Sequence, residues 1–334
     1  MIRRRLERKK GPLGQRVTEI NQLQMTPCLL DARKVQFIRF IISILTKKMW
    51  RLILTLYQSF TRIGTTLMSE AKPPTLPILG APVSVITMKT AVQTIQNWVR
   101  ARRASYVCVR DVHGLMLARH DPQIMQIHQA AGMVTPDGMP LVWVSKLRSK
   151  LKVGRVCGSD LMDALCDAGQ AEGLRHYFYG GKAGIPEAMI NNLRSKYPAL
   201  TVAGSYSPPF RALTAEEDTC IVDAINESCA QVVWVGLSTP KQELWMRDHV
   251  GRVRGATLIG VGAAFDFHSG AVARAPKWMQ RRGLEWLYRL ASEPSRLWRR
   301  YLVMAPLFIF SIIREQIAVT LGRISIEVPE SEEI

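Results

Sequence analysis

The chain has 334 residues, of which 47% are hydrophobic, and its formal net charge is +18. This length allows one large domain or two small ones, and the apolar content supports a packed core and argues against disorder. Its six cysteines form no Cys-x-x-Cys pair and its six histidines form no His-Glu-x-x-His motif. The sequence therefore predicts a reduced cytoplasmic protein with buried thiols and no metal site.

The positive charge is concentrated in two segments. Residues 1–67 contain fourteen Lys and Arg against three acidic residues, and residues 274–300 contain eight against two. The segment between them is close to neutral. Basic segments of this kind suit anionic lipid, nucleic acid or phosphate-bearing ligands, and a solvated charged face is the simpler alternative.

The N-terminal segment shows little sign of a packed unit. Residues 1–34 are basic and polar, so we expect disorder. Residues 35–57 are apolar but interrupted by basic side chains, which favours an amphipathic surface helix over a membrane span of about 20 residues. Translation from Met68, just before a Pro-rich linker at 72–77, is an alternative. We assign residues 1–75 to an N-terminal extension and linker.

From about residue 78 onward, strand-like and helix-like segments alternate. The strand-like runs lie at 83–86, 106–109, 133–135, 176–179, 201–203, 232–235 and 257–261. The helical runs lie near 88–102, 113–130, 139–148, 159–172, 184–197, 214–228 and 240–250. This alternation predicts a Rossmann-like α/β fold over residues 76–272, with a parallel sheet and helices on both faces.

The character of the chain changes after Gly270. Residues 274–300 are basic and rich in Trp, and an apolar run at 302–313 follows them. This run is too short to span a bilayer, but Trp, Tyr and Arg beside an apolar stretch are typical of a membrane interface. A helix packed on the core is the alternative. We assign residues 273–334 to a basic helical appendage that associates with the membrane and ends in an acidic tail.

A single carboxylate follows the strand-like run at 133–135. Pro136, Asp137 and Gly138 come directly after it and precede a helical segment. Ligands bind at such strand ends in open α/β sheets. Because Pro and Gly restrict the turn, Asp137 would be held rigidly enough to act as a general base. The alternative is that Asp137 caps the following helix.

Other strand ends are rich in glycine. The loop that begins with Gly180 and Gly181 opens a helix, so its free N–H groups suit a phosphate or a nucleotide hydroxyl. Gly236 begins a similar loop, and Asp266 follows a third. None of these loops is a Walker loop or a complete Gly-x-Gly-x-x-Gly motif, and a tight turn explains any one of them equally well.

Taken in order, the motifs carry a family resemblance. They are Pro-Asp-Gly-Met-Pro-Leu-Val-Trp, Arg-Val-Cys-Gly-Ser-Asp-Leu, Pro-Lys-Gln-Glu, Gly-Ala-Ala-Phe-Asp-Phe, Arg-Ala-Pro-Lys-Trp-Met and Gly-Leu-Glu-Trp-Leu-Tyr-Arg-Leu. Over roughly residues 78–300 the chain resembles the WecG/TagA/CpsF family of bacterial glycosyltransferases (glycosyltransferase family 26). The resemblance implies inverting, metal-independent and cofactor-free transfer from a UDP-sugar to a polyprenyl-diphosphate-linked sugar, as in cell-surface or exported polysaccharide synthesis.

The resemblance also implies roles for individual residues. It makes Asp137 the base, and it has Arg289, Arg296 and Arg299 of the appendage close over the site. Chemistry agrees, because guanidinium groups can stabilise a departing diphosphate where no metal ion does so. Together with the strand ends, the predicted substrate-binding residues are Asp111, Arg155, Gly180, Gly181, Gly236, Gln242 and Asp266.

Two positions depart from the family pattern. The family has a Thr-x-Asn pair at the strand end before the catalytic Asp, and this chain has Val109 and Asp111 there. The Val removes a hydroxyl group that could form a hydrogen bond. The Asp adds a possible charge, which would alter sugar choice or raise the pKa of Asp137.

The acceptor implied by the resemblance sets the expected partners and location. Because a polyprenyl carrier stays in the bilayer, we expect peripheral binding to the anionic cytoplasmic leaflet through residues 274–320. We expect no nucleic-acid partner, since no nucleic-acid module is recognisable, and homo-oligomers stay possible. The alternatives are a basic nucleic-acid- or membrane-binding α/β protein without catalysis and a nucleotide-dependent oxidoreductase on the same fold. The transferred sugar, the acceptor sugar and the linkage stay open.

Overall fold

The structure is a computed structural model, and it describes residues 72–149 and 151–329, all of which belong to one unit, Thr65–Ile334. The expectations for residues 1–34 and 35–57 and for a start at Met68 lie outside the described residues.

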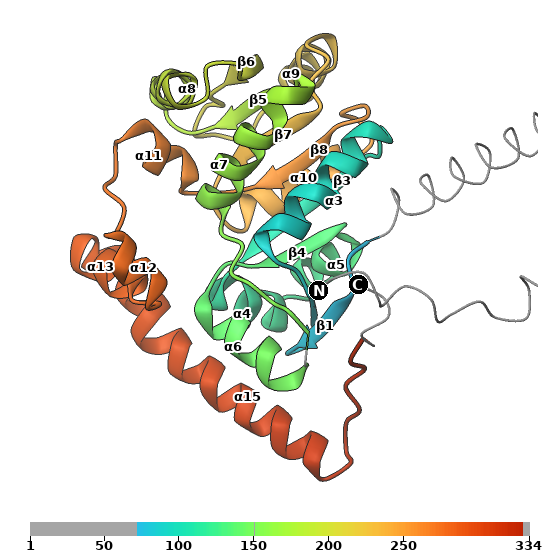
Figure 1. Cartoon of the computed structure of the whole chain (residues 1–334), viewed down its shortest axis with the longest axis vertical. Helices are drawn as coiled ribbons and strands as arrows, with labels where there is room; N and C mark the ends of the chain where they lie inside the picture. Colours follow the sequence, from blue (N-terminus) through green and yellow to red (C-terminus); the bar gives the residue numbers. More distant parts are fainter. Residues whose placement is uncertain (1–71, 150, 330–334) are drawn as a thin grey trace, which may run out of the picture. The chain divides into compact units, whose positions relative to one another are not determined.

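A parallel sheet forms the centre of this unit (Figure 1). Within the described residues its six strands are β3 (Ser105–Arg110), β4 (Met133–Pro136), β5 (Arg175–Gly180), β6 (Thr201–Tyr206), β7 (Val232–Gly236) and β8 (Thr257–Gly260). They lie in the order β4-β3-β8-β7-β5-β6, and every pair is parallel. The predicted α/β fold is therefore confirmed, and all carboxyl ends meet at one edge of the sheet.

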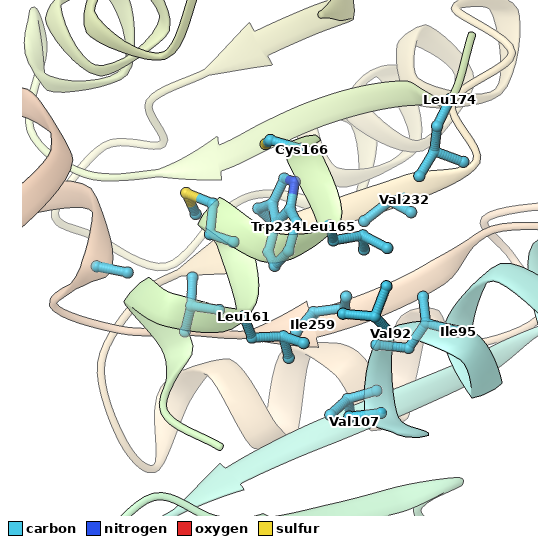
Figure 2. Close-up of a cluster of buried hydrophobic side chains, with 14 of the residues drawn as sticks. Val92, Ile95, Val107, Leu161, Leu165, Cys166, Leu174, Val232, Trp234 and Ile259 are labelled. Atoms are coloured by element: carbon cyan, nitrogen blue, oxygen red, sulfur yellow. The ribbon is translucent and has the colours of Figure 1, made fainter. Parts of the chain in front are cut away.

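Helices cover both faces of the sheet, as the alternating pattern predicts. On one face lie α3 (Met88–Arg100), α7 (Gly158–Gly169) and α8 (Ile185–Lys196), and on the other lie α5 (Pro122–Ala130), α9 (Ala215–Glu227) and α10 (Lys241–His249). Because neighbouring strand residues point to opposite faces, Val107 packs in the first layer and Cys108 in the second. Figure 2 shows the first layer, where Trp234 lies among side chains from α7 and α3.

The first predicted strand does not join this sheet. Residues Ala81–Ser84 form β2, which pairs antiparallel with β1 (Thr75–Ile78) in a separate two-stranded sheet. The segment expected to be a linker at 72–77 thus contributes a strand. Leu79 and Gly80 form the tight two-residue turn, and both have positive φ angles, as this class of hairpin requires.

The long helix expected at 113–130 is two helices. They are α4 (Val112–His120) and α5. Pro122 cannot continue α4 because it lacks an N–H group, and the Asp121 side chain accepts the N–H groups of Gln123 and Ile124 to cap α5.

The segment predicted to be an appendage is helical, and its described part, residues 273–329, is called the appendage below. Its elements are α12 (Lys277–Arg281), α13 (Glu285–Ser292), α14 (Pro294–Trp298), a π-helical turn η3 (Arg299–Val303) and α15 (Met304–Thr320). Figure 1 shows α15 alongside α4 and α6 (Met139–Arg148), against which Phe308 packs. Between the sheet and the appendage lies α11 (Ala264–Ser269).

The apolar part of the appendage is longer than its sequence pattern suggested. The helix runs without a break over Pro294–Thr320, 27 residues, which by length and composition alone is enough to cross a membrane. The expectation that this segment is too short therefore fails. Pro306 lies within this continuous helix, in the first turn after the π-helical turn η3, and the helix continues through it.

Candidate active site

Asp137 lies at the carboxyl edge of the sheet, directly after β4. Its N–H donates to the carbonyl oxygen of Arg110 at 2.8 Å, so the chain holds the register of the β3–β4 pair into the loop. The N-cap of α6 is Gly138 and no side chain caps that helix, so the capping alternative for Asp137 is wrong. The Asp137 side chain is 32% exposed, which leaves its carboxylate within reach of a substrate.

The surroundings of Asp137 make it a stronger base than an ordinary aspartate. Burial raises the pKa of Asp137; Arg155 and Arg289 oppose this rise, while the negative charges of Asp111 and Glu285 add to it. The net direction is upward. A carboxylate with a raised pKa accepts a proton more readily, which suits a general base.

Arg155 lies beside this base and links it to the appendage. Its Nε donates to the main-chain oxygen of Asp137 at 2.6 Å, and its terminal nitrogen lies 2.7 Å from Glu285 on α13. The same terminal nitrogen is 3.6 Å from the Asp137 carboxylate. On the far side of Glu285, Arg274 pairs with Asp160 at 2.5 Å. A chain of alternating charges therefore connects the Asp137 loop to the appendage.

Asp111, at the end of β3, is ionised and paired. It caps α4 by accepting the Gly114 N–H at 3.0 Å, and Arg300 of the appendage donates to its other oxygen with two guanidinium nitrogens. Burial alone would raise the pKa of Asp111, but Arg300 and the Gly114 N–H hold that pKa well below its ordinary value. The charge predicted at this position thus binds an arginine of the same chain.

A buried ion pair lies under the site. Arg110 and Glu243 pair with side chains only 1% and 0% exposed. Gln242 donates to Glu243 at 2.8 Å and accepts the Gly262 N–H at 3.0 Å. The predicted substrate-binding residue Gln242 is therefore buried, and its amide orients the loop after β8.

The glycines at the ends of β5 and β7 are required by the backbone. The Gly181 N–H donates to the Gly236 carbonyl oxygen at 3.1 Å. A Cβ atom on Gly180 would lie 2.6 Å from the Gly236 main chain, closer than any side chain tolerates. Gly181 has a φ of +75°, which favours glycine. The tight-turn interpretation accounts for these residues, and their predicted role in binding stays a prediction.

The three predicted appendage arginines differ in placement. Arg289 is half-buried with its guanidinium 5.5 Å from the Phe267 ring, and its charge acts on both Asp137 and Asp266. Arg296 is exposed and pairs with Glu293 at 2.9 Å. Arg299 is exposed over the Trp298 ring, at 5.3 Å.

Asp266 lies near two of these arginines, Arg289 and Arg296. Burial raises the pKa of its carboxyl group, although the charge of Arg296 opposes the rise. Asp266 is therefore placed between the appendage and the loop that follows β5, where Lys182 also acts on it.

The sequence pattern predicted no role for four residues that connect the appendage to the core. They are Arg274, Glu285, Arg300 and Glu315. Glu285 stands inside the quoted motif Gly-Leu-Glu-Trp, so the motif was a usable signal. Arg299 and Arg300 are adjacent at the start of the π-helical turn η3, and it is Arg300 that reaches Asp111 of the core while Arg299 is exposed.

The described residues contain no group of three or more His, Cys, Asp or Glu side chains that could hold a metal ion. The cations that act on Asp137 at the edge of the sheet are two arginines, Arg155 and Arg289, and guanidinium groups of this kind can bind a phosphate group.

Comparison with known proteins identifies the family. The model of the Glycosyl transferase WecG/TagA/CpsF family matches residues 76–320. The chain belongs to this family. As a member of the WecG/TagA/CpsF family it is a glycosyltransferase, and the oxidoreductase and non-catalytic alternatives are set aside. The match continues to residue 320, so it includes the whole helical appendage through α15.

Two curated relatives are 31% and 30% identical to this chain over the residues that align. One, from Bacillus spizizenii, is 31% identical over 199 residues, which are 60% of this chain and 75% of the relative. The other, from Bacillus subtilis, is 30% identical over 242 residues, covering 67% of this chain and 92% of the relative. Each is named an N-acetylglucosaminyldiphosphoundecaprenol N-acetyl-beta-D-mannosaminyltransferase.

Proposed function

We propose that this glycosyltransferase moves a sugar from a UDP-sugar to a polyprenyl-diphosphate-linked sugar, by inversion and without a metal ion, in the synthesis of a bacterial surface or exported polysaccharide. Residues 76–272 form the catalytic core and residues 273–334 the appendage. The observation that carries the proposal is Asp137, a half-exposed carboxylate with a raised pKa at the edge of the sheet, beside arginines from the core and the appendage.

In the proposed reaction, Asp137 accepts the proton of the acceptor hydroxyl group. The hydroxyl oxygen forms a bond to the anomeric carbon as the bond from that carbon to the UDP oxygen breaks. The leaving UDP carries away the electron pair of that bond, and its negative charge is stabilised by Arg155 and Arg289, with Arg296 nearby. Asp266 and the backbone of the Gly180 and Gly236 loops would bind the rest of the donor.

The names of the relatives support an inverting route. A single displacement on an α-linked nucleotide sugar gives a β-linked product, and both relatives are named for a β-D-mannosaminyl transfer onto a diphosphoundecaprenol-linked sugar. UDP-N-acetylmannosamine is therefore the first donor to test, with N-acetylglucosaminyl-diphospho-polyprenol as the acceptor.

We infer that the appendage binds the cytoplasmic leaflet peripherally. Its helix α15 exposes large apolar side chains, among them Leu307, Ile309, Phe310 and Ile313. The same helix is attached to the core, since Phe308 is buried and Glu315 pairs with Arg148 at 2.6 Å. A helix held along α4 by its middle is better suited to lie on a membrane than to cross it.

The decisive test is transfer by the full-length protein in vesicles, measured with radiolabelled UDP-sugar and a polyprenyl-diphosphate acceptor. The wild type is expected to transfer the label with EDTA present, whereas Asp137→Asn is expected to be inactive. Asp223→Asn, an exposed carboxylate on α9, serves as the matched control and should keep wild-type activity. Turnover by Asp137→Asn at the wild-type rate would refute the base assignment, and a strict requirement for a divalent ion would refute the metal-free route.

A further inference from the structure

Glu285 is a carboxylate in a place where the proposed reaction needs positive charge. It begins α13, its side chain is only 13% exposed, and it points its oxygens at two arginines. A negative charge here weakens the field that would stabilise a departing diphosphate. Glu285 therefore cannot serve to stabilise the leaving diphosphate, and its position indicates a different role in the reaction.

The geometry of Arg155 indicates that role. Its terminal nitrogen is shared unequally between two carboxylates, at 2.7 Å from Glu285 and 3.6 Å from Asp137. Its Nε is bound to the main-chain oxygen of Asp137 and not to its carboxylate. Arg155 thus holds the main chain of the loop at Asp137, while its shortest charge-assisted bond is to Glu285. The Asp137 carboxylate keeps its oxygens available to a substrate hydroxyl group.

We propose that Glu285 is a positioning residue of the transfer reaction, which holds the Arg155 guanidinium group away from the Asp137 carboxylate and so keeps that carboxylate free to accept the proton. The inference rests on the proposed role of Asp137 as the base. Because Glu285 belongs to the appendage and Arg155 to the core, the free base forms only with the appendage in place.

The contacts around α13 fix Glu285 in this position. Arg274 lies 3.7 Å from its second oxygen and is itself tied to Asp160. The turn before α13 packs on the start of α6, since a Cβ atom on Gly283 would lie 3.1 Å from Met139. Glu285 is thus held both by contacts of the appendage, through Arg274 and the turn at Gly283, and by Arg155 of the core.

The other charges near Asp137 have partners of their own. From the end of β3, Arg110 pairs with Glu243 and Asp111 pairs with Arg300. From α13, Arg289 lies over the Phe267 ring.

The charge of Asp137 acts on two further titratable groups, but neither brings a charge to it. The Cys157 thiol, next to Arg155, and the Tyr301 hydroxyl group, next to Arg300, are both neutral because burial raises the pKa of each. Of the groups around the base, Arg155 is therefore the cation whose position a change at Glu285 would alter most.

This arrangement determines the direction in which a change at Glu285 shifts the pKa of Asp137. Glu285→Gln removes a negative charge that raises the pKa of Asp137, and it releases Arg155 to bond the Asp137 carboxylate. Both changes lower the pKa of Asp137. Activity requires the ionised carboxylate, so the acid limb of the pH–rate profile moves to lower pH, and the plateau falls because the base is weaker and less free.

The experiment is the pH dependence of kcat/KM for full-length wild type, Glu285→Gln and Glu315→Gln with the same donor and acceptor. Glu315 is the matched control, since it also joins the appendage to the core through a half-buried ion pair, but with Arg148 and far along α15. We expect the acid limb of Glu285→Gln to fall by about one pH unit, as for a carboxylate that gains a cationic neighbour, with a roughly threefold lower plateau. Glu315→Gln should keep the wild-type acid limb.

The outcomes separate the two proposals. If Asp137→Asn is inactive and the profile of Glu285→Gln superimposes on that of the wild type, the positioning role is wrong and the proposed function stands. If Asp137→Asn stays active, the proposed base fails first. Glu285→Asp keeps the charge and should restore the wild-type acid limb; an acid limb as low as that of the Gln variant contradicts the inference. Glu285→Ala replaces the Gln variant if circular dichroism shows that the latter does not fold.

Discussion

The sheet edge beneath the site and the appendage hold their charged residues in opposite ways. In the core, Arg110 and Glu243 pair with almost no exposure to solvent. In the appendage, charged side chains reach outward to the core, and the links that they form are ion pairs of partly exposed groups, as in Arg300 with Asp111. The other links join Glu285 to Arg155, Arg274 to Asp160 and Glu315 to Arg148.

This difference indicates how the site is assembled. Burial fixes the sheet edge, because breaking a fully buried pair leaves an uncompensated charge. The appendage buries few large side chains, Leu297 and Phe308 among them, and depends more on pairs that salt screens. The proposed base is therefore held by the rigid region, while the arginines proposed to stabilise the leaving diphosphate come from both regions. Arg155 belongs to the core and Arg289 to the appendage, which is more easily displaced.

The largest expected effect is at the base itself. Asp137→Asn should lower kcat by about 10²–10⁴-fold, the usual contribution of a general base. The same variant should be as stable as the wild type or more stable. Since the pKa of Asp137 is raised in the folded protein, its ionisation opposes folding as the pH rises through that pKa. We therefore expect the Asn variant to unfold at an equal or higher temperature near neutral pH, measured by calorimetry; a clear loss of stability would contradict the raised pKa.

Much of this core site could be predicted from local sequence. The residues Pro136, Asp137 and Gly138 themselves indicate a turn, and the alternation of strands and helices predicts the sheet at whose edge this turn lies. The separate β1–β2 hairpin could not be predicted with equal ease, because a strand's pairing partner is set by distant packing and not by its own residues.

The appendage links were harder to predict, since an ion pair depends on which side chain faces which surface. Arg299 and Arg300 are neighbours in one helix, and which of them faces Asp111 depends on how that helix is rotated against the core, which no residue pattern marks. Glu285 lies in a recognised motif, but its partners Arg155 and Arg274 are brought to it only by tertiary packing.

The next largest effect is expected on the stability of the core, at the buried Arg110–Glu243 pair. Arg110→Met should destabilise the protein by about 3–5 kcal/mol, because Glu243 would remain buried without its partner. The double variant Arg110→Met with Glu243→Leu should recover most of that loss. Denaturant unfolding followed by fluorescence gives both values. Equal stability of the single variant and the wild type would mean that the buried pair does not hold the sheet edge.

Among the appendage arginines, Arg289 should matter most. Arg289→Ala is expected to lower kcat by about 10²–10³-fold, the range for a lost contact to developing charge. Arg299→Ala should cost less, since that side chain is exposed over Trp298. Arg247→Ala on α10, whose partner Asp248 is its own neighbour, is the control and should keep full activity. Equal losses for Arg289 and Arg299 would show that stacking on Trp298 does not hold Arg299 away from the substrate.

The smallest expected effect isolates one link between the two regions. Asp111 and Asp121 both cap helices, α4 and α5, but only Asp111 also binds an arginine of the appendage. Because Asn caps helices about as well as Asp, Asp121→Asn should be neutral, whereas Asp111→Asn should cost about 1–2 kcal/mol from its weakened bond to Arg300.

This cost should persist across the neutral range. The pKa of Asp111 is lowered in the folded protein, so its stabilisation is present above the ordinary pKa of an aspartate and is lost only as the pH falls through the folded value. Denaturant unfolding at pH 5 and pH 7 should therefore give the same difference between Asp111→Asn and the wild type. A difference that vanishes between these two pH values would mean that Arg300 does not hold Asp111 in its ionised form, and the appendage would then be attached mainly by its apolar contacts.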